Sequence, residues 1–145
     1  MHKLPHLYQA SASGEDAGNI LLQSNRLPDI DTAPPEEFGG PGDLWSPETL
    51  LVAAVADCFV LTFRAIARAS KLTWHSMTCN VTGTLAKPQT KIQFTHFTIK
   101  ANLILPDAGN ESQAQRILEK SEHSCLITNS LSAKTDLIIA IEYHK

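Results

Sequence analysis

The sequence predicts an α+β fold in which antiparallel sheets pack on two cysteine-bearing helices. A long apolar helical pattern over residues 46–69 precedes two stretches in which apolar and polar residues alternate. A second, amphipathic helical pattern follows, and a last alternating stretch ends the sequence. At 145 residues, this set of elements fits a single domain covering residues 1–145.

The N-terminal third predicts a short hairpin followed by a long loop. Residues 7–12 and 19–24 have the composition of strands, and residues 14–18 form the turn between them. Residues 27–42 contain four prolines and three glycines, and so dense a set of breakers excludes a helix. Long shaped loops inside compact domains are often functional.

The first helix has a well-marked start. Ser46 is a good N-cap, and Pro47 occupies the first helical position, where its missing N–H costs no hydrogen bond. The first half of residues 50–69 is apolar nearly all round, which is typical of a central buried helix. One sheet and one short helix cannot cover so much apolar surface, so we expect a homodimer that buries the rest.

Three strands and a second helix are expected after it. Residues 77–82 and 96–105 alternate as strands do, and residues 87–90 predict the hairpin turn between them. Asn110 offers an N-cap for the second helix, and residues 137–143 predict a C-terminal strand. The inner face of the second helix is formed by Ala114, Ile117, Leu118 and Ser121.

Composition and charge exclude several partners. The net charge is -3 without a basic cluster, which argues against nucleic acid or an anionic membrane as the main partner. The longest apolar run is too short to span a bilayer and is interrupted by Asp57. No apolar signal-peptide segment follows residues 1–6, and three cysteines, an odd number, fit a reducing compartment. We therefore expect a cytoplasmic protein.

Cys58 is the first of two candidate reactive thiols. It lies in the apolar run beside Asp57, a carboxylate that is costly on a buried helix unless it is paired or solvated, so we expect a polar cavity here. Thr62, one turn further on, lies on the same face and can donate a hydrogen bond to a thiolate. The alternative for Cys58 is a core cysteine, the usual role of a small apolar residue on a buried helix.

Cys125 is the second candidate. It follows the second helical pattern among polar residues, two positions after His123, and a capping or core cysteine is again the alternative. Cys79 shares an apolar strand face with Met77 and Val81, and we interpret it as a core residue.

Other kinds of site find no support in the sequence. The six histidines are scattered and no Cys-x-x-Cys pair is present, so we expect no bound metal. Residues 39–42 are rich in glycine but no Lys-Ser/Thr pair follows them, and no Gly-x-Ser-x-Gly elbow of a serine hydrolase occurs. We expect no cofactor.

Residues 46–59 read SPETLLVAAVADCF and resemble the first cysteine helix of the OsmC/Ohr family, the osmotically inducible and organic hydroperoxide resistance proteins. In that family an Asn/Ser-Pro-Glu start precedes an alanine-rich helix and a Cys-Phe pair. The order of elements is similar over nearly the whole chain, including a second helix that ends near Cys125. The resemblance implies an OsmC-like intertwined homodimer with active sites at the subunit interface.

The resemblance also implies a thiol peroxidase that reduces organic hydroperoxides. Cys58 matches the peroxidatic cysteine, which becomes a sulfenic acid, and Cys125 matches the resolving cysteine, which forms a disulfide that an external dithiol reduces. Glu48 matches a glutamate that helps to hold a thiolate-stabilising arginine. A straight helix separates Glu48 from Cys58 by about 15 Å. Their cooperation therefore requires a break in the first turn or a residue from the partner subunit.

The arginine itself is a departure from the family pattern. It lies upstream of Glu48 in relatives, where this sequence has the acidic segments 14–18 and 35–38. Arg26 is the only arginine before the helix and is a candidate substitute, and Leu126 stands where relatives often have a proline. The missing arginine favours an alternative function, a non-catalytic small-molecule-binding protein or a thiol redox sensor. The two cysteines and Glu48 favour the peroxidase.

Overall fold

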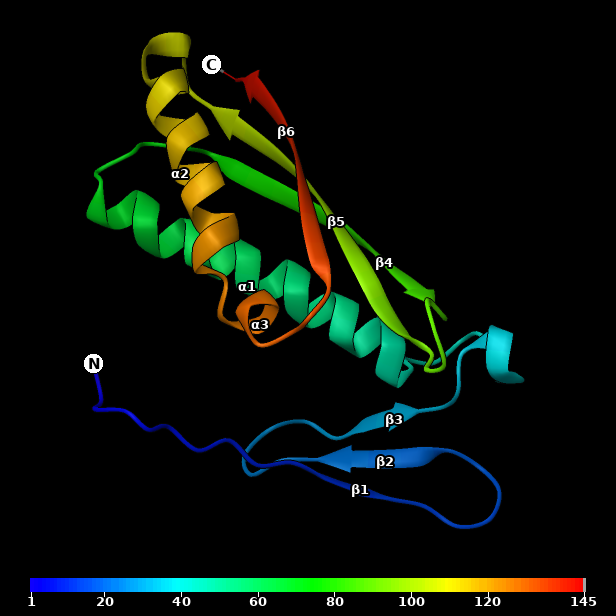
Figure 1. Ribbon diagram of the computed structural model, residues 1–145. Helices are drawn as coiled ribbons and strands as arrows, with labels where there is room; N and C mark the ends of the chain where they lie inside the picture. Colours follow the sequence, from blue (N-terminus) through cyan, green and yellow to red (C-terminus); the bar gives the residue numbers. More distant parts are fainter. Residues whose placement is uncertain (145) are drawn as a thin grey trace. The chain divides into compact units, whose positions relative to one another are not determined.

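The computed structural model describes residues 1–144, which form two compact units. The first unit is Met1–Leu50, and the second begins at Leu51. Figure 1 shows the elements of each unit along the chain.

The first unit contains a small antiparallel sheet in the order β1-β2-β3. The prediction of two strands and a turn is confirmed, although β1 (Ser11–Ser13) begins later than expected; β2 is Ile20–Gln23. The third strand, β3 (Ile30–Thr32), was not expected. Three residues between prolines are too few to show the alternation by which a strand is recognised.

The loop after β3 has a defined shape. It contains the short 3-10 helix η1 (Glu36–Phe38), and the N–H of Gly40 donates a hydrogen bond to the carbonyl of Pro35 at 3.0 Å. A Cβ atom on Gly40 would lie 1.6 Å from the carbonyl oxygen of Pro34, so only glycine fits there.

The helix α1 (Pro47–Ala69) begins where the sequence predicts. The Ser46 hydroxyl accepts a hydrogen bond from the N–H of Thr49 at 3.1 Å, and the Thr49 hydroxyl accepts one from the N–H of Ser46 at 2.8 Å. This reciprocal pair satisfies two backbone donors that the helix start leaves open.

The second unit packs α1 and a second helix against one face of a three-stranded sheet (Figure 1). In chain order, the elements after α1 are β4 (Ser76–Ala86), β5 (Gln93–Leu105), η2 (Ala108–Asn110), α2 (Glu111–Ser124), α3 (Leu126–Asn129) and β6 (Lys134–Tyr143). The α+β class is therefore confirmed. Asn110 is the N-cap residue of α2, as expected, but its side chain makes no capping hydrogen bond.

One strand pairing differs from the expected antiparallel sheet. β4 and β5 are antiparallel, whereas β5 and β6 are parallel over ten residue pairs, from His96 with Lys134 to Leu105 with Tyr143. Because α2 and α3 lie between β5 and β6, the connection returns the chain to the end of the sheet at which β5 starts. The sheet is consequently mixed.

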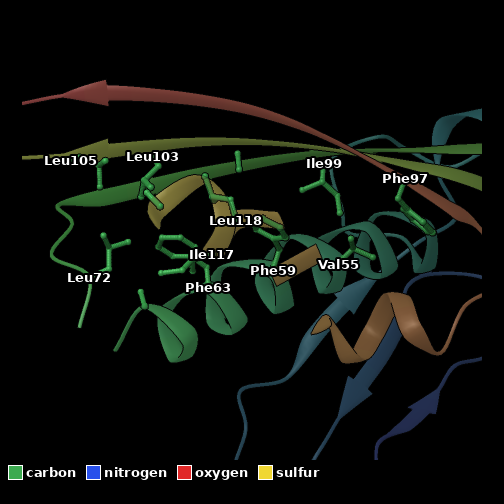
Figure 2. Close-up of a cluster of buried hydrophobic side chains, with 13 residues drawn as sticks. Val55, Phe59, Phe63, Leu72, Phe97, Ile99, Leu103, Leu105, Ile117 and Leu118 are labelled. Atoms are coloured by element: carbon green, nitrogen blue, oxygen red, sulfur yellow. The ribbon is translucent and has the colours of Figure 1, made fainter. Parts of the chain in front are cut away.

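The core of the second unit lies between the sheet and the helices. Figure 2 shows Val55, Phe59 and Phe63 of α1 directed towards the sheet residues and towards α2. All three are fully buried, as are the facing β5 residues Ile99 and Leu103. This packing fixes which side of α1 faces the sheet.

By length and composition alone, α1 could cross a membrane. It has 23 residues, and the mean hydropathy of its most apolar window is 2.0, so the whole helix has the length that the apolar run of its first half lacks. The helix continues past Asp57 to Ala69, as the helical pattern over residues 46–69 predicts. Only 22% of that window is buried within the chain, because the core takes one face of α1 and leaves much of the rest uncovered.

We predict that Phe63→Ala lowers the free energy of unfolding by about 3–5 kcal/mol. The ring is fully buried and meets Trp74 edge to face at 5.2 Å between centroids, so its removal leaves a cavity. Urea unfolding at fixed protein concentration measures the loss. The neighbouring exposed Arg64 is the control, because Arg64→Ala should change the free energy by less than about 0.5 kcal/mol. Equal losses in both variants would contradict the assigned core.

Candidate functional site

Cys58 lies in the middle of α1, on the flank of the face that fills the core. It directly precedes the buried Phe59 and is itself half-buried. Its Sγ atom lies 3.8 Å from the Oγ1 atom of Thr62, one helical turn further on. The structure thus places these two side chains together, as their spacing predicts.

Cys125 lies just after α2, at the junction with α3, rather than within a helix. Its backbone is extended (φ -69, ψ 114), which ends α2 and allows α3 to begin. Its carbonyl accepts hydrogen bonds from the N–H of Asn129 at 3.0 Å and from the Thr128 hydroxyl at 3.2 Å. The side chain is fully buried.

The α2–α3 junction brings Cys125 to Cys58. The Cys125 thiol donates a hydrogen bond to the sulfur of Cys58, and the backbone N–H groups of Leu126 and Ile127 also donate to it. All three cysteines are free thiols in this structure. Two sulfurs 67 positions apart in the sequence are therefore neighbours in the second unit.

The surroundings of Cys58 favour its thiolate. Partial burial alone would raise the pKa of this thiol, but hydrogen bonds outweigh it. In decreasing order, the pKa is lowered by the N–H of Ile127, the thiol of Cys125, the hydroxyl of Thr62 and the N–H of Leu126. The pKa of Cys58 consequently lies below the ordinary value.

The other two thiols are held in the protonated form. Burial raises the pKa of Cys125, and its hydrogen bond to Cys58 raises it further, which together outweigh the hydrogen bonds from Thr128. Burial raises the pKa of Cys79 to about 11. Cys79 packs against the core from β4, which agrees with its interpretation as a core residue.

A cavity of about 640 Å³ opens beside Cys58. Most of its lining is apolar: Ala54, Leu61, Ala65 and Ile66 come from α1, and Leu126 and Ile127 come from α3. The sequence predicts a polar cavity at this point because of Asp57. The cavity is present, but Asp57 is exposed at its edge and solvated, and the lining itself is mainly apolar.

Glu48 lies in the first turn of α1, ten residues before Cys58. The helix is unbroken between them, so the two side chains are separated by about 15 Å along the helix. The Oε2 atom of Glu48 is buried and has no hydrogen-bond partner among residues 1–144. A buried carboxylate oxygen without a donor is costly.

Arg26 occupies an exposed turn that follows β2, with its backbone in the left-handed region (φ 66). It belongs to the first unit, whereas both reactive-thiol candidates belong to the second. Its role as a substitute for the family arginine stays a prediction.

Sequence reasoning missed two parts of this site. The first is the pair of backbone N–H groups from Leu126 and Ile127, which no side-chain pattern could indicate. The second is Lys120 of α2, which is exposed, as its helical position predicts, and also lines the cavity. Within residues 1–144, no group of three His, Cys, Asp or Glu side chains is arranged to hold a metal ion.

Comparison with known proteins identifies relatives of this fold. Residues 40–140 match the family of OsmC-like proteins. The uncharacterized protein YmaD of Bacillus subtilis is 22% identical over 106 residues, which cover 71% of each chain.

Solved structures agree over nearly the whole chain. An OsmC-like protein of unknown function from Vibrio cholerae superposes with a TM-score of 0.85 at 17% identity, covering 93% of this chain and 99% of the other. An organic hydroperoxide resistance protein from Elizabethkingia anophelis has a TM-score of 0.77 at 19% identity, covering 99% and 100%. The organic hydroperoxide resistance protein OsmC from Legionella pneumophila has a TM-score of 0.72 at 23% identity, covering 97% and 99%.

The family match spans the helix that carries Cys58, the sheet and the α2–α3 junction that carries Cys125. With the same fold found in the solved structures, this chain belongs to the family of OsmC-like proteins.

Proposed function

We propose that this protein is a thiol peroxidase that reduces organic hydroperoxides in a reducing cytoplasm, with Cys58 as the peroxidatic and Cys125 as the resolving cysteine. One observation carries the proposal. A thiol with a lowered pKa opens to an apolar cavity and has a second, buried thiol hydrogen-bonded to it. Proteins of the same fold that are named organic hydroperoxide resistance proteins support the same function.

In the first step, the Cys58 thiolate attacks the terminal oxygen of the hydroperoxide. An S–O bond forms, the O–O bond breaks, and the leaving alkoxide takes up a proton to become an alcohol. The sulfur is oxidised by two electrons to a sulfenic acid. The apolar lining of the cavity suits the organic part of such a substrate.

In the second step, the Cys125 sulfur attacks the sulfenic sulfur of Cys58. A disulfide forms, and the hydroxyl of the sulfenic acid leaves as water with the proton of Cys125. The burial of Cys125 keeps it protonated and away from bulk oxidant until Cys58 has reacted. An external dithiol then reduces the disulfide through a mixed disulfide and restores both thiols.

Neutral donors stabilise the thiolate in this arrangement. The groups that lower the pKa of Cys58 are backbone N–H groups, a thiol and a hydroxyl. An arginine would add a full charge, and the unpartnered Oε2 atom of Glu48 fits a role in holding one. We propose that Arg26 supplies this guanidinium, from the same chain or from a partner subunit.

We also propose that the protein works as a homodimer. On α1, the exposed Leu61 and Ala65 lie one turn apart on the side of Cys58, away from the sheet. An exposed apolar helix face of this kind marks an interface with another molecule. A second copy of the chain would bury this face next to the cavity.

Substitution of the thiols separates their roles. We expect Cys58→Ser to abolish the consumption of cumene hydroperoxide, because Cys58 carries the one sulfur among the described residues that line the cavity. Cys125→Ser should allow one turnover and leave Cys58 as a sulfenic or higher acid, detected by mass spectrometry. Cys79→Ser should leave turnover unchanged. Equal activity of Cys58→Ser and the unmodified protein would exclude the peroxidase function and leave the binding or redox-sensing alternative.

The pH dependence of alkylation tests the state of each thiol. Only the thiolate reacts, so a lowered pKa moves the half-maximal rate of Cys58 to a pH below that of a free thiol, about 8.5. Cys79 should react last, with a midpoint near its pKa of about 11. Iodoacetamide labelling between pH 5 and 11, read by peptide mass spectrometry, measures both. A Cys58 midpoint above that of a free thiol would contradict the assigned hydrogen bonds.

Substitutions at two positions, Thr62 and Arg26, test which groups set the pH at which alkylation of Cys58 is half-maximal. Thr62→Val removes a donor to Cys58 and should raise its midpoint, whereas Thr62→Ser keeps the hydroxyl and should not. Arg26→Gln should raise the midpoint by about one unit if this guanidinium stabilises the thiolate. Arg64→Gln, an exposed arginine on α1, is the control. An unchanged midpoint in Arg26→Gln would reject the role of Arg26.

Light scattering tests the dimer. We expect a mass of about twice 15.8 kDa at micromolar concentration, since each copy would cover the open face of the other's α1. Leu61→Lys places a charge on that face and should shift the mass towards that of one chain, with Arg64→Lys as a charge-neutral control. A stable folded monomer of the unmodified protein would overturn the proposed interface.

A further inference from the structure

Cys79 is the thiol that the proposed cycle does not use. It lies on β4 between Met77 and Val81, on the face of the strand that packs against the core. Its partner across the ladder is Ala101 of β5, which is fully buried. Ala101 is the smallest core side chain of β5, so the inner face of the sheet leaves most room at the level of Cys79.

Cys79 and Cys125 are close enough for their charges to interact. Burial raises the pKa of Cys79 to about 11, and the charge of a Cys125 thiolate contributes to this rise. One charge acts on another through the core in this way only when the two groups are near neighbours. Cys125 also donates a hydrogen bond to Cys58, whereas Cys79 is not among the groups that shift the pKa of Cys58. The three sulfurs thus form one cluster in which Cys125 interacts with both of the others.

The backbone leaves Cys125 and β4 some freedom to approach each other. Cys125 has an extended backbone between two helices, so no helical turn restricts the staggered rotamers about its Cα–Cβ bond. Within the second unit, β4 is an edge strand and only β5 pairs with it. The Cys125 sulfur can therefore turn from α1 towards the sheet.

We propose that Cys79 is a second resolving thiol, which takes over the disulfide from Cys58 when the external dithiol is scarce. This role rests on the proposed peroxidase function, which supplies the Cys58–Cys125 disulfide. The Cys79 thiolate attacks the sulfur of Cys125, a Cys79–Cys125 bond forms, and the bond to Cys58 breaks. Cys58 leaves as a thiolate, and the proton that Cys79 has lost passes to solvent. The exchange involves no net oxidation.

The surroundings of the thiols set the direction and the rate of the exchange. Cys58 is the better leaving group, because hydrogen bonds from Ile127 and Thr62 stabilise its thiolate. Cys79 attacks slowly, since a pKa of about 11 leaves a thiolate fraction on the order of 10⁻⁴ at pH 7. An abundant dithiol therefore reduces the Cys58–Cys125 disulfide first. For this reason Cys79→Ser does not change turnover when reductant is in excess.

The exchange restores the Cys58 thiolate beside the cavity. A second hydroperoxide then oxidises Cys58 to a sulfenic acid, while the first oxidation is retained in the core as the Cys79–Cys125 disulfide. Without reductant, one chain thus takes up two oxidising equivalents instead of one.

Disulfide mapping tests the transfer. Reduced protein, freed of reductant, receives one equivalent of cumene hydroperoxide at pH 9, and samples taken over time are quenched in acid, alkylated with N-ethylmaleimide and digested without reduction. We expect the Cys58–Cys125 disulfide to form first and the Cys79–Cys125 disulfide to replace it, while Cys58 becomes alkylated again. The rate of replacement should rise about tenfold per pH unit between pH 7 and 9, as the thiolate fraction of Cys79 does.

Two variants that lack this sulfur, Cys79→Ser and Cys79→Ala, are the controls. In both, the Cys58–Cys125 disulfide should persist, and hydroperoxide consumption without reductant should stop at one equivalent. The unmodified protein should consume a second equivalent in a slow phase. A Cys58–Cys125 disulfide that persists at pH 9 in the unmodified protein as it does in the variants would overturn the proposal.

Diamide separates this proposal from the peroxidase function, because it oxidises thiol pairs to disulfides without a hydroperoxide. A protein that consumes no cumene hydroperoxide would reject the peroxidase function, and the diamide-treated protein would then decide the role of Cys79. A Cys79–Cys125 disulfide with Cys58 free to be alkylated would support the transfer. A Cys58–Cys125 disulfide alone would reject it.

Discussion

The contact between the middle of α1 and the α2–α3 junction is the interaction on which the candidate site depends. It gives Cys58 its second thiol and its two backbone donors. The contact depends in turn on the rotation of α1 about its own axis, which the core fixes through Val55, Phe59 and Phe63. Since Cys58 is the neighbour of Phe59, a rotation that exposed the ring would also take the sulfur away from the junction.

The two thiols show how different surroundings give identical side chains opposite pKa shifts. Cys58 is half-buried and surrounded by donors, so its charged form is favoured. Cys125 is fully buried and donates to its neighbour, so its neutral form is favoured. Each state supports the other, because the proton retained by Cys125 is the one that stabilises the charge on Cys58.

Local patterns in the sequence were sufficient for the elements and for the side-chain neighbours within one helix. The Ser46-Pro47 start, the alternation in β4 and β5 and the spacing of Cys58 and Thr62 all depend on residues a few positions apart. The strand β3 and the helix α3 have three and four residues, which is barely more than one period and too short to show a repeating pattern. The backbone donors carry no sequence signature at all. Lys120 could not be recognised because its position depends on how two helices pack, which a single helical period does not specify.

The parallel pairing of β5 and β6 has a consequence for how the chain folds. Such a pair cannot close as a hairpin; the whole segment between the strands must first be ordered, and long-range pairing of this kind is slow. Cys125 lies inside that segment, whereas Cys58 lies on a helix formed by local contacts. The two sulfurs therefore meet only when the segment between β5 and β6 has folded against α1. In a newly made chain the pair is separated by an open loop, and proximity of the thiols becomes a property of the completed fold alone.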